Sequence, residues 1–245
     1  MAPERVQEPL MEQRTESEES SSSPEEGIGG GAPGNRNRRR VGLLGGSFDP
    51  VHTGHLYVAR MAQERAGLDE VLFVPAARPP HKPDRVLTPG PDRMALLEAA
   101  LEGEARMRVI DLELDRTGPS FTIDTVRALE ERLGGHGSVE LHLILGGDNL
   151  PGLGSWREVD DLLGRVTPLV VHRSEDLQGV LESVGGDLAP HLVEKLRRGL
   201  IVVEPHAASS TELRERLGRR EDPGEHLPEG CLEIVAERGL YGWMG

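Results

Sequence analysis

The chain has 245 residues and a formal net charge of −14, with 28 Lys and Arg against 42 Asp and Glu. This length permits one large domain or two small ones, and the acidic balance argues against a protein that coats a nucleic-acid polymer. Its single cysteine, Cys231, excludes an internal disulfide and a cysteine-cluster metal site. No apolar run approaches the roughly 20 residues that span a bilayer, and the N-terminus has no apolar secretory segment. We therefore expect a cytoplasmic protein without membrane contact.

Residues 1 to 40 are predicted to form a disordered extension. They combine a serine run with a glycine run and hold almost no large apolar side chains. The arginines near the end of this stretch, Arg36 and Arg38 to Arg40, could touch an anionic partner. A solvated arm ahead of the first strand is the simpler interpretation.

From residue 41 onward, short apolar runs alternate with helical periods. In chain order we expect a strand (41–44), helix (54–66), strand (71–74), helix (92–101), strand (108–112), helix (122–133), three strands (141–145, 168–171, 200–203) and two helices (210–217, 232–238). This alternation predicts an α/β fold: a Rossmann-like doubly wound parallel sheet in a single domain, residues 41 to 245. Ligands in such sheets bind beyond the carboxyl ends of the strands, so the turns there should carry the chemistry.

The turn after the first strand has an unusual composition. It reads Gly45-Gly46-Ser47-Phe48-Asp49-Pro50-Val51-His52-Thr53-Gly54-His55. Glycines let a backbone approach a phosphate closely, and the N-terminus of the following helix favours an anion. His52 and His55 are spaced so that both imidazoles can face one ligand. Taken singly, the glycines could form only a turn and the histidines could bind a metal.

As a whole, this segment resembles the His-x-Gly-His turn of the nucleotidylyltransferase superfamily. The longer match, from the paired glycines to the second histidine, is similar to its nicotinate-nucleotide adenylyltransferase branch. The resemblance implies contacts with ATP from Gly45, Gly46, Ser47, Phe48, His52 and His55. Of these, His55 is the best candidate for stabilising the transition state.

A second phosphate segment is predicted after the last strand. It reads Ser209-Ser210-Thr211-Glu212-Leu213-Arg214. Ser209 and Glu212 have the spacing of a capping box, which needs no ligand. Arg214, expected in the first turn of the helix, opposes the helix dipole, and a bound polyphosphate would reverse that penalty. The segment is similar to the family's Ile-Ser-Ser-Thr-x-Ile-Arg motif, with Ala208 and Leu213 replacing the isoleucines. The resemblance implies ATP contacts from Ser209, Ser210, Thr211 and Arg214, and a catalytic set of His52, His55 and Arg214.

The acceptor side of the site is predicted from further matches to the same branch. The loop Arg78 to Lys82 is stiffened by proline, and in the family such a loop lies over the substrates. The stretch Gly118 to Thr125 lines the pyridine pocket in the family, where a tyrosine usually replaces Phe121. After the strand at 141–145, the family uses an aspartate at the nucleotide and a tryptophan that stacks on the pyridine. The expected mononucleotide contacts are Lys82, Ser120, Phe121, Thr122, Asp148, Trp156 and Arg173.

Each of these matches also has an ordinary structural interpretation. The Lys82 loop could be only a loop, Thr122 and Asp148 could be helix caps, and Trp156 could belong to the core. Arg173 is followed by Ser174 and Glu175 where the family has Pro-Gly.

The resemblance implies that the 5′-phosphate of nicotinate mononucleotide attacks the α-phosphorus of ATP and expels pyrophosphate. Positioning and charge neutralisation would supply the catalysis, and Mg²⁺ would arrive on the ATP phosphates without a dedicated protein metal site. Three alternatives stay open: another acceptor such as nicotinamide mononucleotide or phosphopantetheine, a cytidylyl donor, or a nucleotide-binding regulatory module without turnover. The sequence indicates no oligomeric state.

Overall fold

The computed structural model describes residues 38–79, 86–116, 118–172 and 188–243, with the single residues 179, 181 and 184. The predicted extension lies almost entirely outside this range. Its last three residues contact the folded part: Arg38 donates to the Gly137 carbonyl, Arg39 pairs with Glu70, and Arg40 donates to the Ala66 carbonyl.

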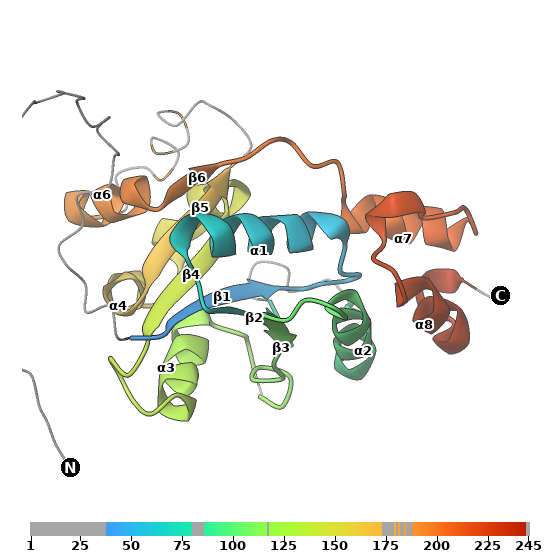
Figure 1. The fold of residues 1–245 in the computed structure, drawn as a ribbon, viewed down its shortest axis with the longest axis horizontal. Coiled ribbons are helices and arrows are strands. Elements are labelled where there is room, and N and C mark those ends of the chain that lie inside the picture. The colour runs from blue at the N-terminus through green and yellow to red at the C-terminus, as the bar shows by residue number, and fades with distance from the viewer. Residues whose placement is uncertain are drawn as a thin grey trace, which may run out of the picture. The chain divides into compact units, whose positions relative to one another are not determined.

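Six parallel strands form one sheet at the centre of the fold (Figure 1). They are β1 (Arg40–Gly46), β2 (Glu70–Pro75), β3 (Met107–Val109), β4 (Glu140–Gly146), β5 (Thr167–His172) and β6 (Leu200–Val202). Their order is β3-β2-β1-β4-β5-β6, with Leu43 of β1 opposite Leu72 on one side and Leu143 on the other. The chain order reverses between β1 and β4, which makes the carboxyl ends of these two strands the expected ligand site.

All six predicted strands are present; the last ends at Val202, one residue before its predicted end, and the third is clearly shorter than predicted. The strand expected over 108–112 ends at Val109, since the chain turns away through residues 112–115. Ile110 keeps one backbone bond to Phe73. Apolar residues can thus continue past the end of a strand when the loop beyond it is also buried.

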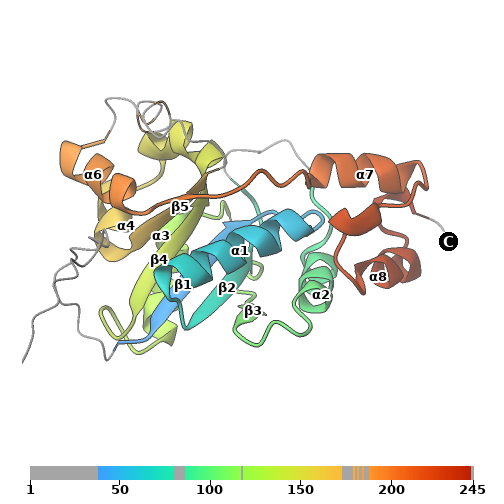
Figure 2. The same cartoon turned by 45° about the horizontal axis from the view of Figure 1, so that its top comes forward.

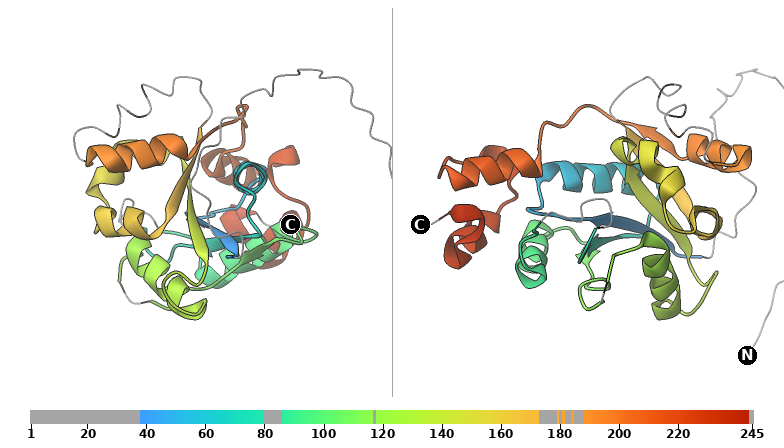
Figure 3. Two further views of the ribbon diagram at one scale, coloured as in Figure 1. Left: turned by 60° about the vertical axis from the view of Figure 1, so that its left-hand side comes forward. Right: turned by 180° about the vertical axis from the view of Figure 1, so that it is seen from behind.

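Helices cover both faces of the sheet, as the alternation predicted (Figure 3, left). One face carries α1 (Thr53–Ala66), α2 (Gly90–Ala100), α7 (Ser210–Gly218) and α8 (Cys231–Arg238), and the other α3 (Thr122–Arg132), α4 (Val159–Arg165) and α6 (Pro190–Arg198). Strand alternation divides the core between them, because Val41 and Leu43 join one apolar cluster and Leu44 joins the other. None of the helices in the described residues is long and apolar enough to cross a membrane.

The sequence missed two helices and misplaced one helix face. These are α4, with seven residues, and α6, with nine, neither of which was among the predicted elements. The helical period of the predicted helix 92–101 turns Met94 inward together with Leu97 and Leu101, but Met94 is only half-buried. Arg93 and Leu96 are buried there instead. Periodicity counts apolar residues, so it could not place an arginine in the core.

Candidate active site

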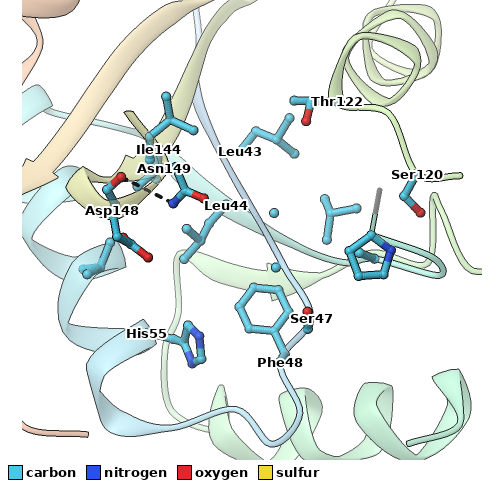
Figure 4. Close-up of a pocket in the computed structure, with 18 of the residues that line it drawn as sticks. Leu43, Leu44, Ser47, Phe48, His55, Ser120, Thr122, Ile144, Asp148 and Asn149 are labelled. Carbon is cyan, nitrogen blue, oxygen red and sulfur yellow. Dashed lines mark hydrogen bonds between the residues drawn. The ribbon is translucent and has the colours of Figure 1, made fainter. Parts of the chain in front are cut away.

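A cavity of about 640 Å³ opens at the carboxyl ends of β1 and β4. It brings together segments that lie far apart in the sequence. Figure 4 shows His55 and Asp148 at one side of the cavity, with Ser120 and Thr122 toward the other. Fourteen predicted site residues line it: Gly45, Gly46, Ser47, Phe48, His52, His55, Ser120, Phe121, Thr122, Asp148, Trp156, Ser209, Ser210 and Thr211.

Two stacked histidines stand at the N-terminus of α1. Their ring centroids are 3.7 Å apart, and His52 caps the helix with an extended backbone. The His52 backbone N–H donates to Nδ1 of His55 over 3.2 Å. Because Nδ1 accepts this bond, its proton is on Nε2, and His55 can present an N–H donor to a ligand. The first turn of α1 holds no acidic residue, so nothing there offsets the positive end of the helix.

Gly54, between the two histidines, leaves room for the His52 ring. A Cβ at this position would lie 3.0 Å from Nδ1 of His52. Any larger residue would push this ring away from its partner. The His-x-Gly-His spacing therefore has a steric reason as well as an electrostatic one.

The turn before α1 is held from behind by a buried arginine. Arg93 of α2 is only 2 % exposed and donates to the backbone carbonyls of Ser47 (2.7 Å) and Thr88 (2.8 Å). Burial lowers the pKa of its guanidinium, and the charge of Asp49 is the largest opposing influence. Asp49 is itself a buried residue. The backbone of the predicted phosphate turn thus rests on a polar group inside the fold.

The N-terminus of α7 docks directly on the same turn (Figure 2). The Ser210 hydroxyl donates to the Pro50 carbonyl over 2.9 Å. Arg214 donates to the Asp49 carbonyl and, over 3.1 Å, to the Thr211 hydroxyl. The two predicted phosphate segments, 160 residues apart, therefore form one structure.

Two details of the α7 prediction are corrected. Arg214 is the fifth residue of α7, so it lies past the first turn, and the structure places it against Asp49 rather than among the residues that line the cavity. The Ser209 side chain makes no capping bond, so the capping-box interpretation is wrong. Ser209 faces the cavity instead.

The opposite wall of the cavity is built around the start of α3. Its N-cap is Phe121, without a side-chain cap bond, so Thr122 is not the cap that its sequence position allowed. The Ser120 hydroxyl accepts the backbone N–H groups of Ala77 (3.1 Å) and Arg78 (3.2 Å). Ser120 therefore ties the chain after β2 to the start of α3.

Glu113 is a functional candidate that the sequence reasoning missed. Its side chain lines the cavity although the residue is only 6 % exposed. The Thr125 hydroxyl donates to it over 2.6 Å, and the Ser120 hydroxyl also hydrogen-bonds it. Burial raises the pKa of this carboxyl, and these two bonds oppose the rise together with the charge of Arg116. An acidic residue just past an apolar run is usually exposed, so the sequence carried no signal for it.

Trp156 and Asp148 complete the cavity after β4. Trp156 packs on one core cluster and also lines the cavity, so the core and binding interpretations are both compatible with its place. Asp148 lies in a 3-10 segment, η1 (Gly147–Ser155), and a Cβ at Gly146 would lie 2.3 Å from its Oδ1. Arg157, which the sequence did not single out, lies over the Phe121 ring at 4.9 Å from its centroid.

Two predicted mononucleotide contacts, Lys82 and Arg173, lie outside the described residues. Among the residues that are described, no group of three or more His, Cys, Asp or Glu side chains is placed to hold a metal ion.

Comparison with known proteins agrees with this geometry. Residues 43–216 match the family model described as cytidylyltransferase-like. A relative from Dehalococcoides mccartyi is 34% identical over 203 residues, covering 82% of this chain and 97% of the relative. Another, from Shouchella clausii, is 39% identical and covers 83% of this chain and 97% of the relative. Both are described as a probable nicotinate-nucleotide adenylyltransferase.

Solved structures share the fold. Plasmodium falciparum nicotinic acid mononucleotide adenylyltransferase complexed with NaAD superposes with a TM-score of 0.63 at 18% identity, covering 84% of this chain and 98% of that one. The fold and site define a cytidylyltransferase-like protein with a doubly wound sheet. Within that class, the chain belongs to the nicotinate-nucleotide adenylyltransferase family.

Proposed function

We propose that this chain transfers the adenylyl group of ATP to nicotinate mononucleotide, giving deamido-NAD and pyrophosphate. The observation that carries the proposal is the single cavity at the switch point between β1 and β4. One end of it is made by the N-termini of α1 and α7, and the other by Phe121, Thr122 and Trp156. A polyphosphate suits the first end, and a flat pyridine ring suits the second.

The chemistry requires no protein nucleophile. An oxygen of the acceptor's 5′-phosphate forms a bond to the α-phosphorus, while the bond from that phosphorus to the bridging oxygen breaks and pyrophosphate leaves with the electron pair. Catalysis then depends on alignment and on donors that meet the developing charge. The Nε2–H of His55 and the N-terminus of α1 are the groups best suited to this role. A bound phosphate would also offset the repulsion between the two stacked imidazoles whenever both carry a proton.

The α7 segment is expected to hold the rest of the triphosphate. Ser209, Ser210 and Thr211 line the cavity at a helix N-terminus. Arg214, bonded to the Asp49 carbonyl, fixes this terminus against the turn that carries His52. Arg214 thus supports the phosphate site through its position, and direct contact with a phosphate stays a prediction.

The acceptor is expected at the α3 wall. Trp156 would stack on the pyridine ring, and the N-terminus of α3 would attract the ring carboxylate. Mg²⁺, bound to the ATP phosphates, would neutralise charge on the pyrophosphate leaving group. This chain's own residues would orient the triphosphate and keep the two substrates in line.

Pyrophosphate release from ATP tests the proposal. The purified chain should release pyrophosphate with nicotinate mononucleotide, and kcat/KM should be lower with nicotinamide mononucleotide. Phosphopantetheine, and CTP in place of ATP, serve as controls for the other transferases of the superfamily. Equal or better turnover with the amide would overturn the acceptor assignment, and ATP binding without turnover on any acceptor would favour a regulatory module.

A further inference from the structure

The cavity must accept two anionic substrates, yet its described walls carry few cationic groups. Apart from the two histidines, Arg157 is the one Lys or Arg among the described residues that line it. Three carboxylates line it as well: Asp49, Glu113 and Asp148. Where carboxylates outnumber cations, the place of the Arg157 guanidinium determines where an anionic group of a ligand is attracted rather than repelled.

Arg157 lies at the acceptor end. It follows Trp156 directly, and its guanidinium carbon is 4.9 Å from the centroid of the Phe121 ring. This cation–π contact holds the guanidinium at the Phe121 ring, and its N–H groups remain donors that a ligand in the cavity can meet. Phe121 is also the N-cap of α3. The guanidinium therefore lies beside the helix terminus expected to face the pyridine ring.

The protein partners of Arg157 hold it loosely. Its Nη1 is 3.6 Å from Asp124 and its Nε is 3.4 Å from Glu158, and the side chain is 51% exposed. Arg127 lies at 4.0 Å from Asp124 and at 2.6 Å from Glu158, so it already pairs with both carboxylates. A substrate carboxylate can thus replace these contacts of Arg157 without leaving Asp124 or Glu158 unpaired.

We propose that the Arg157 side chain selects an acceptor that carries a carboxylate on its pyridine ring over one that carries an amide. This inference rests on the proposed function and adds a residue that determines its specificity. A guanidinium donates to a carboxylate through charge-assisted bonds, whereas a neutral amide lacks the charge–charge attraction and offers only one acceptor oxygen. The side chain is half exposed, so we expect about a tenfold contribution to selectivity, the low end for a charged hydrogen bond.

The experiment compares kcat/KM for nicotinate and nicotinamide mononucleotides in Arg157→Gln. The value for the nicotinate form should fall about tenfold through KM. The value for the amide form and the KM for ATP should stay within about twofold, the scatter expected for a site without a charged contact. Arg157→Lys keeps the charge but loses the planar stacking, so it should retain part of the selectivity.

Arg219→Gln is the matched control. Arg219 is likewise exposed and lies 3.4 Å from Glu215 and 3.8 Å from Glu221, but it does not line the cavity. It should leave the selectivity ratio unchanged. An equal loss on both acceptors in Arg157→Gln would show only a structural wall and overturn the inference, as would an unchanged ratio. A wild-type protein that prefers the amide would overturn the proposed acceptor and this inference together, whereas the first two results leave the proposed function intact.

Discussion

The two ends of the cavity are built in different ways. The proposed phosphate end consists of two contiguous segments, the turn from Gly45 to His55 and the start of α7, and the donors it offers are backbone N–H groups and neighbouring side chains. The proposed acceptor end is assembled from separate segments of the chain: Glu113, the start of α3 from Ser120 to Thr122, and Trp156 with Arg157. A phosphate can be bound by backbone N–H groups at a helix N-terminus, so one local motif is enough to form such an end. The acceptor differs between enzymes, and its wall can change residue by residue.

The largest effect is expected at the phosphate end, from His55→Ala. This removes an N–H donor that the His52 backbone holds in one tautomer. Turnover should fall by roughly 10²–10³-fold, as for the loss of one transition-state donor. Steady-state kinetics with each acceptor would measure it, and the fold loss should be the same for both. A fall in turnover that differed between the two acceptors would show that His55 also acts on the acceptor, against a separation of the two ends.

Arg93→Met should come next. It leaves the carbonyls of Ser47 and Thr88 without a buried donor, so the free energy of unfolding should drop by roughly 2–4 kcal/mol. Denaturant unfolding measures this, and kcat should fall as well because the phosphate turn loses its anchor. Arg93→Lys keeps the charge without the two-pronged geometry and should recover only part of either loss. Reduced stability with an unchanged kcat would make Arg93 a support of the fold alone.

The contrast between the ends also explains what the sequence could predict. Apolar runs placed all six strands, and the phosphate motif was read directly because its members are neighbours in the chain. Arg93 and Glu113 were missed because a charged residue alone indicates a surface position, and only the fold shows that hydrogen-bond partners surround these two inside the protein. Arg157 was missed because its candidate role depends on its position over the Phe121 ring, 36 positions earlier in the chain. Only the fold brings these two residues together.

Glu113→Gln should have a smaller effect, confined to the acceptor end. Ser120 already accepts two backbone N–H groups, so its own proton must be donated. The Glu113 carboxylate can accept from both Ser120 and Thr125, whereas an amide of the same size offers one acceptor and turns a donor toward the other hydroxyl. The start of α3 should shift, raising the KM for the mononucleotide by about tenfold.

The KM for ATP separates the possible roles of Glu113. The KM for ATP should stay unchanged in Glu113→Gln if this carboxyl positions only the acceptor wall. Glu102→Gln, a change at an exposed position in the turn after α2, serves as the control for altered net charge. A Glu113→Gln protein with wild-type KM values would show that the side chain fills space without orienting its neighbours.

The smallest effect should come from Trp156→Ala. Stacking of a base on an aromatic ring contributes about 1–3 kcal/mol to binding. Part of the Trp156 side chain packs against the core, so we use the lower value. The KM for the mononucleotide should rise about fivefold, with the KM for ATP unchanged, because 1 kcal/mol corresponds to about that factor. The KM should rise by the same factor for the nicotinate and the nicotinamide mononucleotide, since each presents the same ring face to Trp156. That equality distinguishes stacking from the carboxylate selection assigned to Arg157, and Trp156→Phe should restore most of the loss. A rise of the same size in the KM for ATP would instead show that Trp156 contributes to binding both substrates. The cavity would then not divide into a phosphate end and an acceptor end at this residue.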